Sequence, residues 1–168
     1  MADCKVIVAG AGPAGLAAAA LLAKEGLATT VVAPAAGEDP RTVALMQPSI
    51  QLLRYLDIWP GKLESETSPL RKLRIIDDTG SLLVAPNLEF ASQDLNLEAF
   101  GWNVPLALLL PVLRRRAEDL GVTFVEATAT GAVSRDGAIH VTLSNSTEIS
   151  ATLCLAADGA NSVLRKAA

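Results

Sequence analysis

The segment GAGPAG, residues 10–15, has the G-x-G-x-x-G spacing that can hold a diphosphate. Gly10 would allow a tight turn after a strand, Gly12 would let phosphate oxygens approach the backbone, and Gly15 would let a helix pack closely on that strand. The phosphates would then lie at the helix N-terminus, where unpaired N–H groups and the helix dipole favour negative charge. The same glycines could instead serve only close packing, but their strand-turn-helix context favours a dinucleotide site.

The stretches that flank these glycines predict the elements that position them. Residues 5–9 and 28–33 are short apolar runs rich in β-branched residues, which predicts two buried strands. Residues 13–25 are rich in Ala and Leu and end at Gly26, as expected of a helix with a C-terminal glycine. Together they form a βαβ unit, which implies parallel strands and a right-handed crossover.

The rest of the chain predicts an α/β fold in which antiparallel hairpins interrupt the parallel core. We expect helices at 48–55, 104–120 and 162–166, a third buried strand at 122–126, a closing strand at 153–157 into which residues from 148 onward lead, and hairpins formed by 72–77 with 81–85 and by 128–134 with 138–143. Pro111 should kink or restart the second of these helices. Residues 87–101 show no clear period, which predicts a loop with short helical turns.

A dinucleotide site of this kind usually has an acidic residue at the end of the second strand, where it binds the ribose hydroxyls. Here Ala33 holds that place. Glu38 and Asp39 follow too late to replace it unless the loop folds back. A standard NAD site is therefore less favoured, whereas NADP could be held through Arg41.

Two further segments carry a family resemblance, namely DPRTVALMQPSIQLLRYLDIWPG at 39–61 and AADGANSVLRKAA at 156–168. With the glycine motif, they resemble the flavoprotein aromatic monooxygenases, and most closely the ubiquinone-biosynthesis hydroxylases. The resemblance covers essentially the whole chain and includes LRKLRIIDDTG and FGWNVP. It implies a Rossmann-like FAD-binding domain over residues 1–168, with FAD as cofactor, NADH or NADPH as electron donor, O2 as co-substrate and a polyprenylated phenol as substrate.

The resemblance also implies which residues bind the cofactor. The first motif matches the loop around the FAD pyrophosphate, and Arg41 matches an arginine near the cofactor, where a guanidinium would be a strong donor to a diphosphate. The second motif matches a signature associated with both FAD and NAD(P)H. The implied cofactor-binding residues are Gly10, Gly12, Pro13, Ala14, Gly15, Arg41, Asp158, Gly159, Ser162 and Arg165.

Local chemistry gives the second motif a structural role as well. Asp158 could cap the following helix, and Gly159 could form the turn. Ser162 and Arg165, three residues apart, would share one helix face. Ala156 stands where the family signature has its first glycine, so its methyl group could crowd the strand end.

No catalytic side chain can be named from this sequence. It contains no Ser-His-Asp or Cys-His set, and its single histidine, His140, falls in a predicted hairpin strand, which favours a structural role. Cys4 and Cys154 belong to no metal-ligand cluster, so we expect no metal site and two buried thiols. The alternatives are a stand-alone dinucleotide-binding module without redox activity and an NADP-dependent reductase, which would lack a catalytic Tyr-Lys or Cys pair.

Charge and composition limit which partners and which cellular location are expected. The net charge is −4 and the basic residues are scattered apart from residues 114–116, which precede two acids, so nucleic-acid binding is not expected. Residues 6–23 carry no formal charge, but glycines interrupt them and no basic segment precedes them, which disfavours a membrane span or a signal peptide. We expect a cytoplasmic protein, with peripheral association at the inner membrane left open.

Half of the residues are hydrophobic (51%), and members of the resembled family are longer and carry a third flavin signature further along. We therefore expect this chain to be the N-terminal part of such a hydroxylase, binding FAD weakly or not at all and hydroxylating nothing by itself. Residues 106–113 would then be partly exposed and would drive self-association.

Overall fold

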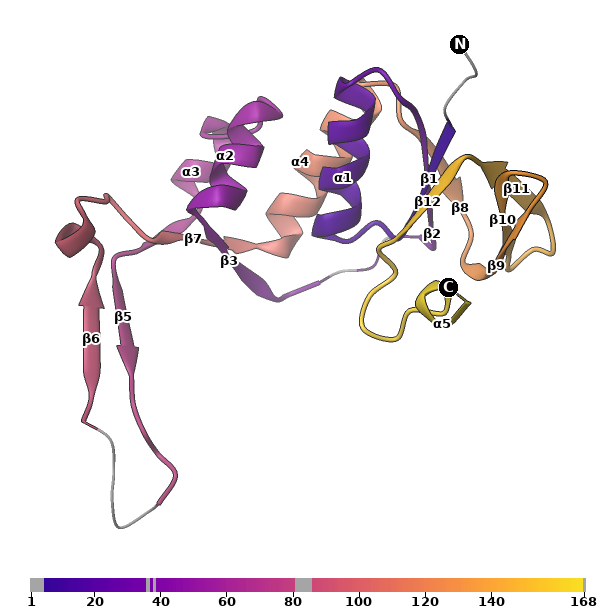
Figure 1. The fold of residues 1–168 in the computed structure, drawn as a ribbon. Coiled ribbons are helices and arrows are strands. Elements are labelled where there is room, and N and C mark those ends of the chain that lie inside the picture. The colour runs from indigo at the N-terminus through magenta and orange to yellow at the C-terminus, as the bar shows by residue number, and fades with distance from the viewer. Residues whose placement is uncertain (1–4, 36, 38, 81–85, 168) are drawn as a thin grey trace. The chain divides into compact units, whose positions relative to one another are not determined.

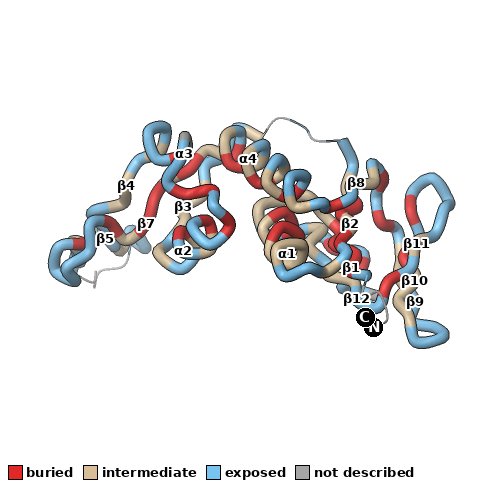
Figure 2. The backbone as a smooth tube through the Cα atoms, turned by 90° about the horizontal axis from the view of Figure 1, so that it is seen from above, coloured by how far each residue is buried: buried red, intermediate tan, exposed pale blue. Residues whose placement is uncertain are grey.

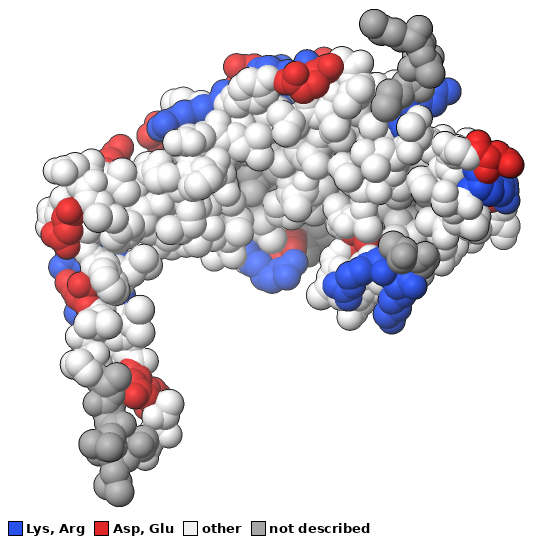
Figure 3. Space-filling view, viewed as in Figure 1, with Lys and Arg blue, Asp and Glu red and all other residues white. Residues whose placement is uncertain are grey.

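The computed structural model describes residues 5–35, 37, 39–80 and 86–167. The chain forms two compact units, one made of residues 1–40 with 106–168 and the other of residues 41–105. No helix in the described part of the chain is both long and apolar enough to cross a membrane. Figure 3 shows the charged side chains on one face in small separate groups, in agreement with their scatter along the sequence.

The first unit is built on a parallel sheet that contains the predicted βαβ unit. Its strand order is β12-β1-β2-β8, and all three pairings are parallel. The strands are β1 (Lys5–Ala9), β2 (Ala28–Ala33), β8 (Thr123–Glu126) and β12 (Leu153–Ala156), and helix α1 (Pro13–Lys24) joins the first two. The predicted fold class is confirmed. However, β8 and β12 are half-exposed edge strands, so the strand predicted as buried at 122–126 is only partly buried.

Two different layers cover the faces of this sheet. Helices α1 and α4 (Leu106–Asp119) lie together on one side, and an antiparallel sheet with the order β11-β10-β9 lies on the other (Figure 1). Its strands are β9 (Ala129–Arg135), β10 (Ala138–Leu143) and β11 (Glu148–Ala151). The predicted hairpin at 128–143 is thus confirmed.

Alternation along the strands divides the core between the two layers. Ile7, Ala9 and Val32 belong to a buried cluster shared with β9–β11, with Val125 of β8 packed against it. Because successive side chains of a strand point to opposite faces, Val31 and its same-face neighbours must point toward the helices. Figure 2 shows the resulting buried positions along β1 and β2.

Helix α4 begins later than the sequence predicted, because residues 101–105 form a strand. Its buried residues are Leu106, Leu109, Leu113 and Ala117, a spacing of three and four that places them on one face. Pro111 lies inside the helix and does not end it. This proline is exposed, so its ring lies on the side of the helix away from the core.

The second unit contains strands that the sequence did not reveal. An antiparallel sheet has the order β3-β7-β4, and a separate ribbon pairs β5 with β6. Its elements are β3 (Thr42–Met46), α2 (Gln47–Tyr55), α3 (Gly61–Ser65), β4 (Ser68–Leu70), β5 (Lys72–Ile75), β6 (Leu88–Ala91), the 3-10 helix η1 (Ser92–Leu95) and β7 (Gly101–Pro105). Trp59 and Trp102 meet edge to face, with ring centroids 5.2 Å apart.

The hairpin predicted around DDTG has a different second strand. β5 pairs with β6, so that Leu73 lies opposite Phe90 and Ile75 opposite Leu88. The predicted partner, 81–85, lies outside the described residues. This register brings apolar residues together on one face of the ribbon. The sequence did not reveal β6, because residues 87–101 show no clear period.

The C-terminal segment divides between two sheets. The closing strand predicted at 153–157 is β12, and the residues that lead into it form a separate strand, β11; the two are separated at Thr152, whose N–H donates to the Lys5 carbonyl (3.0 Å). The last helix, α5 (Leu164–Ala167), begins two residues later than expected.

Candidate dinucleotide site

The first motif forms the turn that the sequence predicted. Gly10 has φ +112°, which strongly favours glycine, and its N–H donates to the Val32 carbonyl (2.8 Å). Gly12 is the N-cap of α1, and Pro13 follows in the first turn. No side chain caps this helix and no acidic residue lies in its first turn, so its first N–H groups can serve an anion.

The three glycines have three separate spatial reasons to lack a side chain. A Cβ on Gly10 would lie 2.2 Å from the Ala157 carbonyl oxygen, and a Cβ on Gly15 would lie 2.1 Å from the Gly10 carbonyl oxygen. A Cβ on Gly12 would have no atom of the described residues within 4 Å, apart from those of its own turn and helix. Folding therefore requires Gly10 and Gly15, whereas Gly12 leaves open space beside the helix N-terminus.

The second motif lies directly against the first. The Ala157 N–H donates to the Ala9 carbonyl (2.8 Å), which continues the pairing of β12 with β1 to the edge of the glycine turn. Gly159 then turns the chain with φ +90°. The contact between Gly10 and Ala157 joins two segments that are almost 150 residues apart in the sequence.

Within the second motif, polar contacts hold the loop before α5. The Asp158 Oδ2 accepts a hydrogen bond from the Val163 N–H (3.0 Å), and the Ser162 Oγ accepts one from the Arg165 N–H (2.9 Å). Ser162 is buried and caps α5, so the prediction that it shares a helix face with Arg165 is wrong. The Arg165 guanidinium donates to the Ala160 carbonyl (2.9 Å) and closes the loop.

The carboxyl group of Asp158 is held in its charged form. Burial raises the pKa of Asp158. Hydrogen bonds from Ser162 and from backbone N–H groups together lower it by more than burial raises it, so the pKa lies below its ordinary value. Its Oδ1 is buried and accepts no hydrogen bond from the described residues. Asp158 is therefore an ionised acceptor with one oxygen still to be satisfied beside the glycine turn.

Ala156 and Ala33 stand where the sequence departs from the expected motifs, and the structure shows how each is placed. Ala156 is exposed and stays in register with Ala9, so its methyl group does not crowd the strand end. Ala33 is half-buried at the end of β2 and lies in register with Glu126 of β8. The Ala127 N–H donates to the Ala33 carbonyl (3.1 Å) and ties these two strand ends together.

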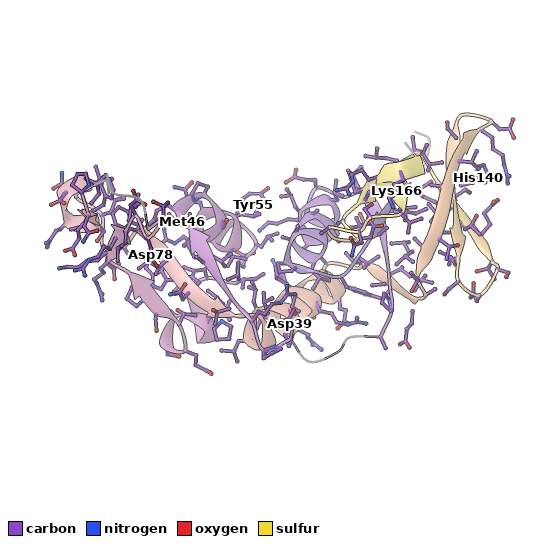
Figure 4. All side chains as sticks on the ribbon, turned by 90° about the horizontal axis from the view of Figure 1, so that it is seen from below. Asp39, Met46, Tyr55, Asp78, His140 and Lys166 are labelled. Atoms are coloured by element: carbon purple, nitrogen blue, oxygen red, sulfur yellow. The ribbon has the colours of Figure 1, made fainter. Side chains whose placement is uncertain are left out.

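A groove of about 850 Å³ starts at the glycine turn and runs between α1 and α4. Its wall is mostly apolar and includes Ala11 of the turn, Leu16 of α1 and Leu110 of α4. Asp39 also lines it and lies beside α4 in Figure 4. Residues of the loop after β2 thus reach the groove; Glu38 lies outside the described residues.

A second groove, of about 550 Å³, lies beside the exposed edge of β12. It is lined by Gly159, Ser162 and Arg165 together with Cys154 and side chains of β9 and β10. The predicted site residues are thus divided between the turn at the first groove and the wall of the second. Burial, followed by the charge of Asp158, raises the pKa of the Cys154 thiol, which disfavours its reactive thiolate form.

Arg41 immediately precedes β3 in the second unit, where it is exposed.

Sequence reasoning missed Gly101 of β7, the residue that allows this strand to lie close to β3. A Cβ on Gly101 would lie 2.2 Å from the Leu45 carbonyl oxygen, so glycine allows β7 to pair closely with β3.

His140 lies on β10, as predicted. Its Nδ1 is 3.0 Å from the Glu148 carboxylate and 3.2 Å from the Arg135 guanidinium. These contacts join β9, β10 and β11 and give His140 a structural role. Among the described residues, no group of three or more His, Cys, Asp or Glu side chains is arranged to hold a metal ion.

Comparison with known proteins identifies the family. A family model described as an FAD binding domain matches residues 3–168. No match was found among curated proteins.

Solved structures share the fold at low identity. The Diels-Alderase PyrE3 of pyrroindomycin biosynthesis has a TM-score of 0.80 at 24% identity, over 98% of this chain and 34% of that chain. The anhydrotetracycline hydroxylase OxyS from Streptomyces rimosus has 0.77 at 21%, over 97% and 33%. The 2-methyl-3-hydroxypyridine-5-carboxylic acid oxygenase has 0.74 at 19%, over 99% and 42%.

The present chain therefore spans well under half of the length of each of these three structures. Its match to the family model, by contrast, covers all but its first two residues. The glycine turn, the second motif packed against it and this match together show that the chain belongs to the FAD-binding domain family.

Proposed function

We propose that this chain is the FAD-binding part of a flavoprotein monooxygenase that hydroxylates a polyprenylated phenol in ubiquinone biosynthesis, using NADH or NADPH and O2. The observation that carries the proposal is the contact between the two motifs, with the Gly10 turn seated on the Ala157 backbone and open space at Gly12. The family match supports FAD, and two of the three solved structures above are named as a hydroxylase and an oxygenase. The resemblance of residues 39–61 and 156–168 to the ubiquinone-biosynthesis hydroxylases supports the substrate class.

The residues of this chain would bind and orient the cofactor. The N–H groups at the start of α1, at Ala14 and Gly15, would donate to the diphosphate at Gly12. Asp158 and Gly159 would hold the neighbouring loop in place, and Arg41 would add positive charge. FAD itself supplies the redox chemistry, so the protein needs no nucleophile of its own.

The binding claim can be tested on the chain as it stands. Titration with FAD, NAD and NADP, followed by thermal shift and by NMR of the backbone amides, should show FAD shifting Gly10, Gly12 and Gly15 most strongly. Because the chain spans only part of its relatives, we expect weak binding and no oxidation of NADPH. NAD or NADP binding in preference to FAD would favour the alternative of a stand-alone dinucleotide-binding module.

The substrate claim needs the complete gene product. Its gene should restore ubiquinone in a bacterium that lacks one ring hydroxylase, with the lipid measured by mass spectrometry. The matched control is the same gene carrying Gly12→Ala, which should fold and fail to restore ubiquinone. Restoration by this variant, or none by the wild type, would contradict the proposal.

The named activity of PyrE3 shows why this test is needed. This protein is named as a Diels-Alderase, and its TM-score of 0.80 is higher than those of the hydroxylase and the oxygenase. The same fold thus serves more than one kind of reaction.

A cytoplasmic enzyme with peripheral contact at the inner membrane would suit a polyprenylated substrate, and fractionation of cells expressing the gene would test that location.

A further inference from the structure

The ribose position of the site lacks its usual acid. In dinucleotide sites of this architecture, a carboxylate at the end of the second strand accepts hydrogen bonds from the adenosine ribose hydroxyls. Ala33 at the end of β2 cannot do so. A ribose placed there would leave both hydroxyl groups without a protein acceptor, unless another strand supplies one.

Glu126 is the residue that lies beside this vacant position. In the parallel pairing of β2 with β8, Ala33 and Glu126 are direct partners, and such strands are about 4.8 Å apart. Directly paired residues of neighbouring strands point to the same face of a sheet. The side chain of Glu126 therefore leaves the sheet on the same side as that of Ala33, from the adjacent strand end.

Two contacts identify this face as the one that carries the groove. Val125 packs against the core on the β9–β11 side, so Phe124 and Glu126 must point to the opposite side. Phe124 confirms this direction, because the Arg114 guanidinium of α4 lies 4.2 Å from its ring centroid. Arg114 also lines the groove that starts at the glycine turn.

The carboxylate of Glu126 is available for a ligand. Its side chain is exposed, and no hydrogen bond or ion pair joins it to another residue in the described part of the chain. Asp39, the other acid near the groove, is already engaged in an interaction within the protein. It also belongs to the loop after β2 rather than to the strand ends.

We propose that Glu126, from the neighbouring strand β8, accepts the hydrogen bonds of the adenosine ribose hydroxyls in place of the missing acid at position 33. The inference rests on the proposed function, because it concerns the adenosine half of the bound FAD. A carboxylate at this place also repels a 2′-phosphate, so the site selects an adenosine with both hydroxyls unmodified.

The test uses the full chain and two nucleotides, ADP and 2′,3′-dideoxy-ADP. Dissociation constants are measured by NMR titration for the wild type, for Glu126→Gln and for the control Asp39→Asn. The wild type should bind ADP about ten- to a hundredfold more tightly than the dideoxy nucleotide, as expected for hydrogen bonds to a charged acceptor. Glu126→Gln should lose most of this preference and bind adenosine 2′,5′-bisphosphate more tightly than the wild type does, whereas Asp39→Asn should keep the preference for ADP.

The outcomes separate this inference from the proposed function. If ADP shifts the amides of the glycine turn but Glu126→Gln keeps the full preference, the role of Glu126 is wrong and the nucleotide site stands. Loss of the preference in Asp39→Asn instead would assign the ribose to the loop. If ADP shifts none of the glycine-turn amides, the proposed function fails together with the inference.

Discussion

At the scale of single residues, Gly10 and Gly12 differ in what they do despite their shared motif. Gly10 combines a positive φ with a carbonyl oxygen where its Cβ would lie, so the fold depends on it. Gly12 has φ −72° and ψ 176°, which any residue can adopt, and its Cβ would meet only open space. One glycine therefore serves folding and the other serves the ligand.

We predict that substitution by alanine separates these two roles. Gly10→Ala should lower the free energy of unfolding by about 3 kcal/mol or more, because the backbone strain and the clash with Ala157 act together. Gly12→Ala should cost less than about 1 kcal/mol, the usual effect of alanine at an N-cap. Urea denaturation measures both, and equal losses in the two variants would contradict this division.

Asp158 gives a second prediction, which concerns pH. Because its pKa is lowered in the folded state, its contribution to stability is complete above the unfolded value of 3.8 and is lost as the pH falls through the folded pKa. Asp158→Asn should be less stable than the wild type by about 0.5–1 kcal/mol at pH 7, since it loses a charged acceptor. The difference should shrink as the pH falls below 3.8, as measured by urea denaturation at decreasing pH. A difference that stays constant down to pH 2 would show that the charge is not involved.

The sequence could predict the residues of the glycine turn because their reasons are local: a tight turn and a helix start. The role of Gly101 could not be predicted, because it depends on the approach of Leu45, more than fifty residues earlier. The same holds for Glu126, whose position beside Ala33 comes from strand pairing alone. The start of the last helix was predicted two residues too early, at Ser162, because the start of a short helix depends on which side chain caps it.

At the scale of elements, α4 continues through Pro111, although proline removes one helical hydrogen bond and its ring crowds the preceding turn. The helix tolerates this because Leu106, Leu109 and Leu113 are buried on both sides of the proline. The sequence predicted this helix from its apolar period, but the strand before it took residues 101–105. The pairing of β7 with β3 and β4 therefore moved the start of the helix from residue 104 to residue 106, while the helix itself formed as predicted.

We predict that Pro111→Ala stabilises the protein by about 1–3 kcal/mol, because alanine restores the hydrogen bond and removes the clash. The matched control is Pro13→Ala in the first turn of α1, where proline is well tolerated and the change should stay within about 0.5 kcal/mol. Thermal unfolding followed by circular dichroism measures both. A destabilised Pro111→Ala variant would mean that the proline ring makes packing contacts worth more than the helix gains.

At the scale of the whole molecule, residues 106–113 are partly exposed, as the sequence predicted, with Ala107 and Pro111 exposed. Three leucines of residues 106–113 are buried. A separate group of exposed apolar side chains lies on one face of the β5–β6 ribbon, at Leu73, Ile75, Leu88 and Phe90, whereas Lys72 and Arg74 pair with Glu89 on the other face.

Self-association of the chain stays a prediction, now with this ribbon as its origin. Sedimentation velocity at rising concentration should show oligomers for the wild type and fewer for the double variant Ile75→Lys with Phe90→Lys. Lys72→Gln, on the charged face, is the control and should behave as the wild type does. A wild type that stays monomeric at high concentration would contradict the prediction.

The central claim is that the glycine turn and the second motif packed against it form an FAD site. The most direct test is titration of FAD into the full chain, wild type and Gly12→Ala, followed by NMR of the backbone amides and by flavin fluorescence. We predict saturable shifts at residues 10–15 for the wild type, and binding at least tenfold weaker in a Gly12→Ala variant that remains folded. Absence of shifts in the wild type, or equal affinity of the two proteins, would contradict the account.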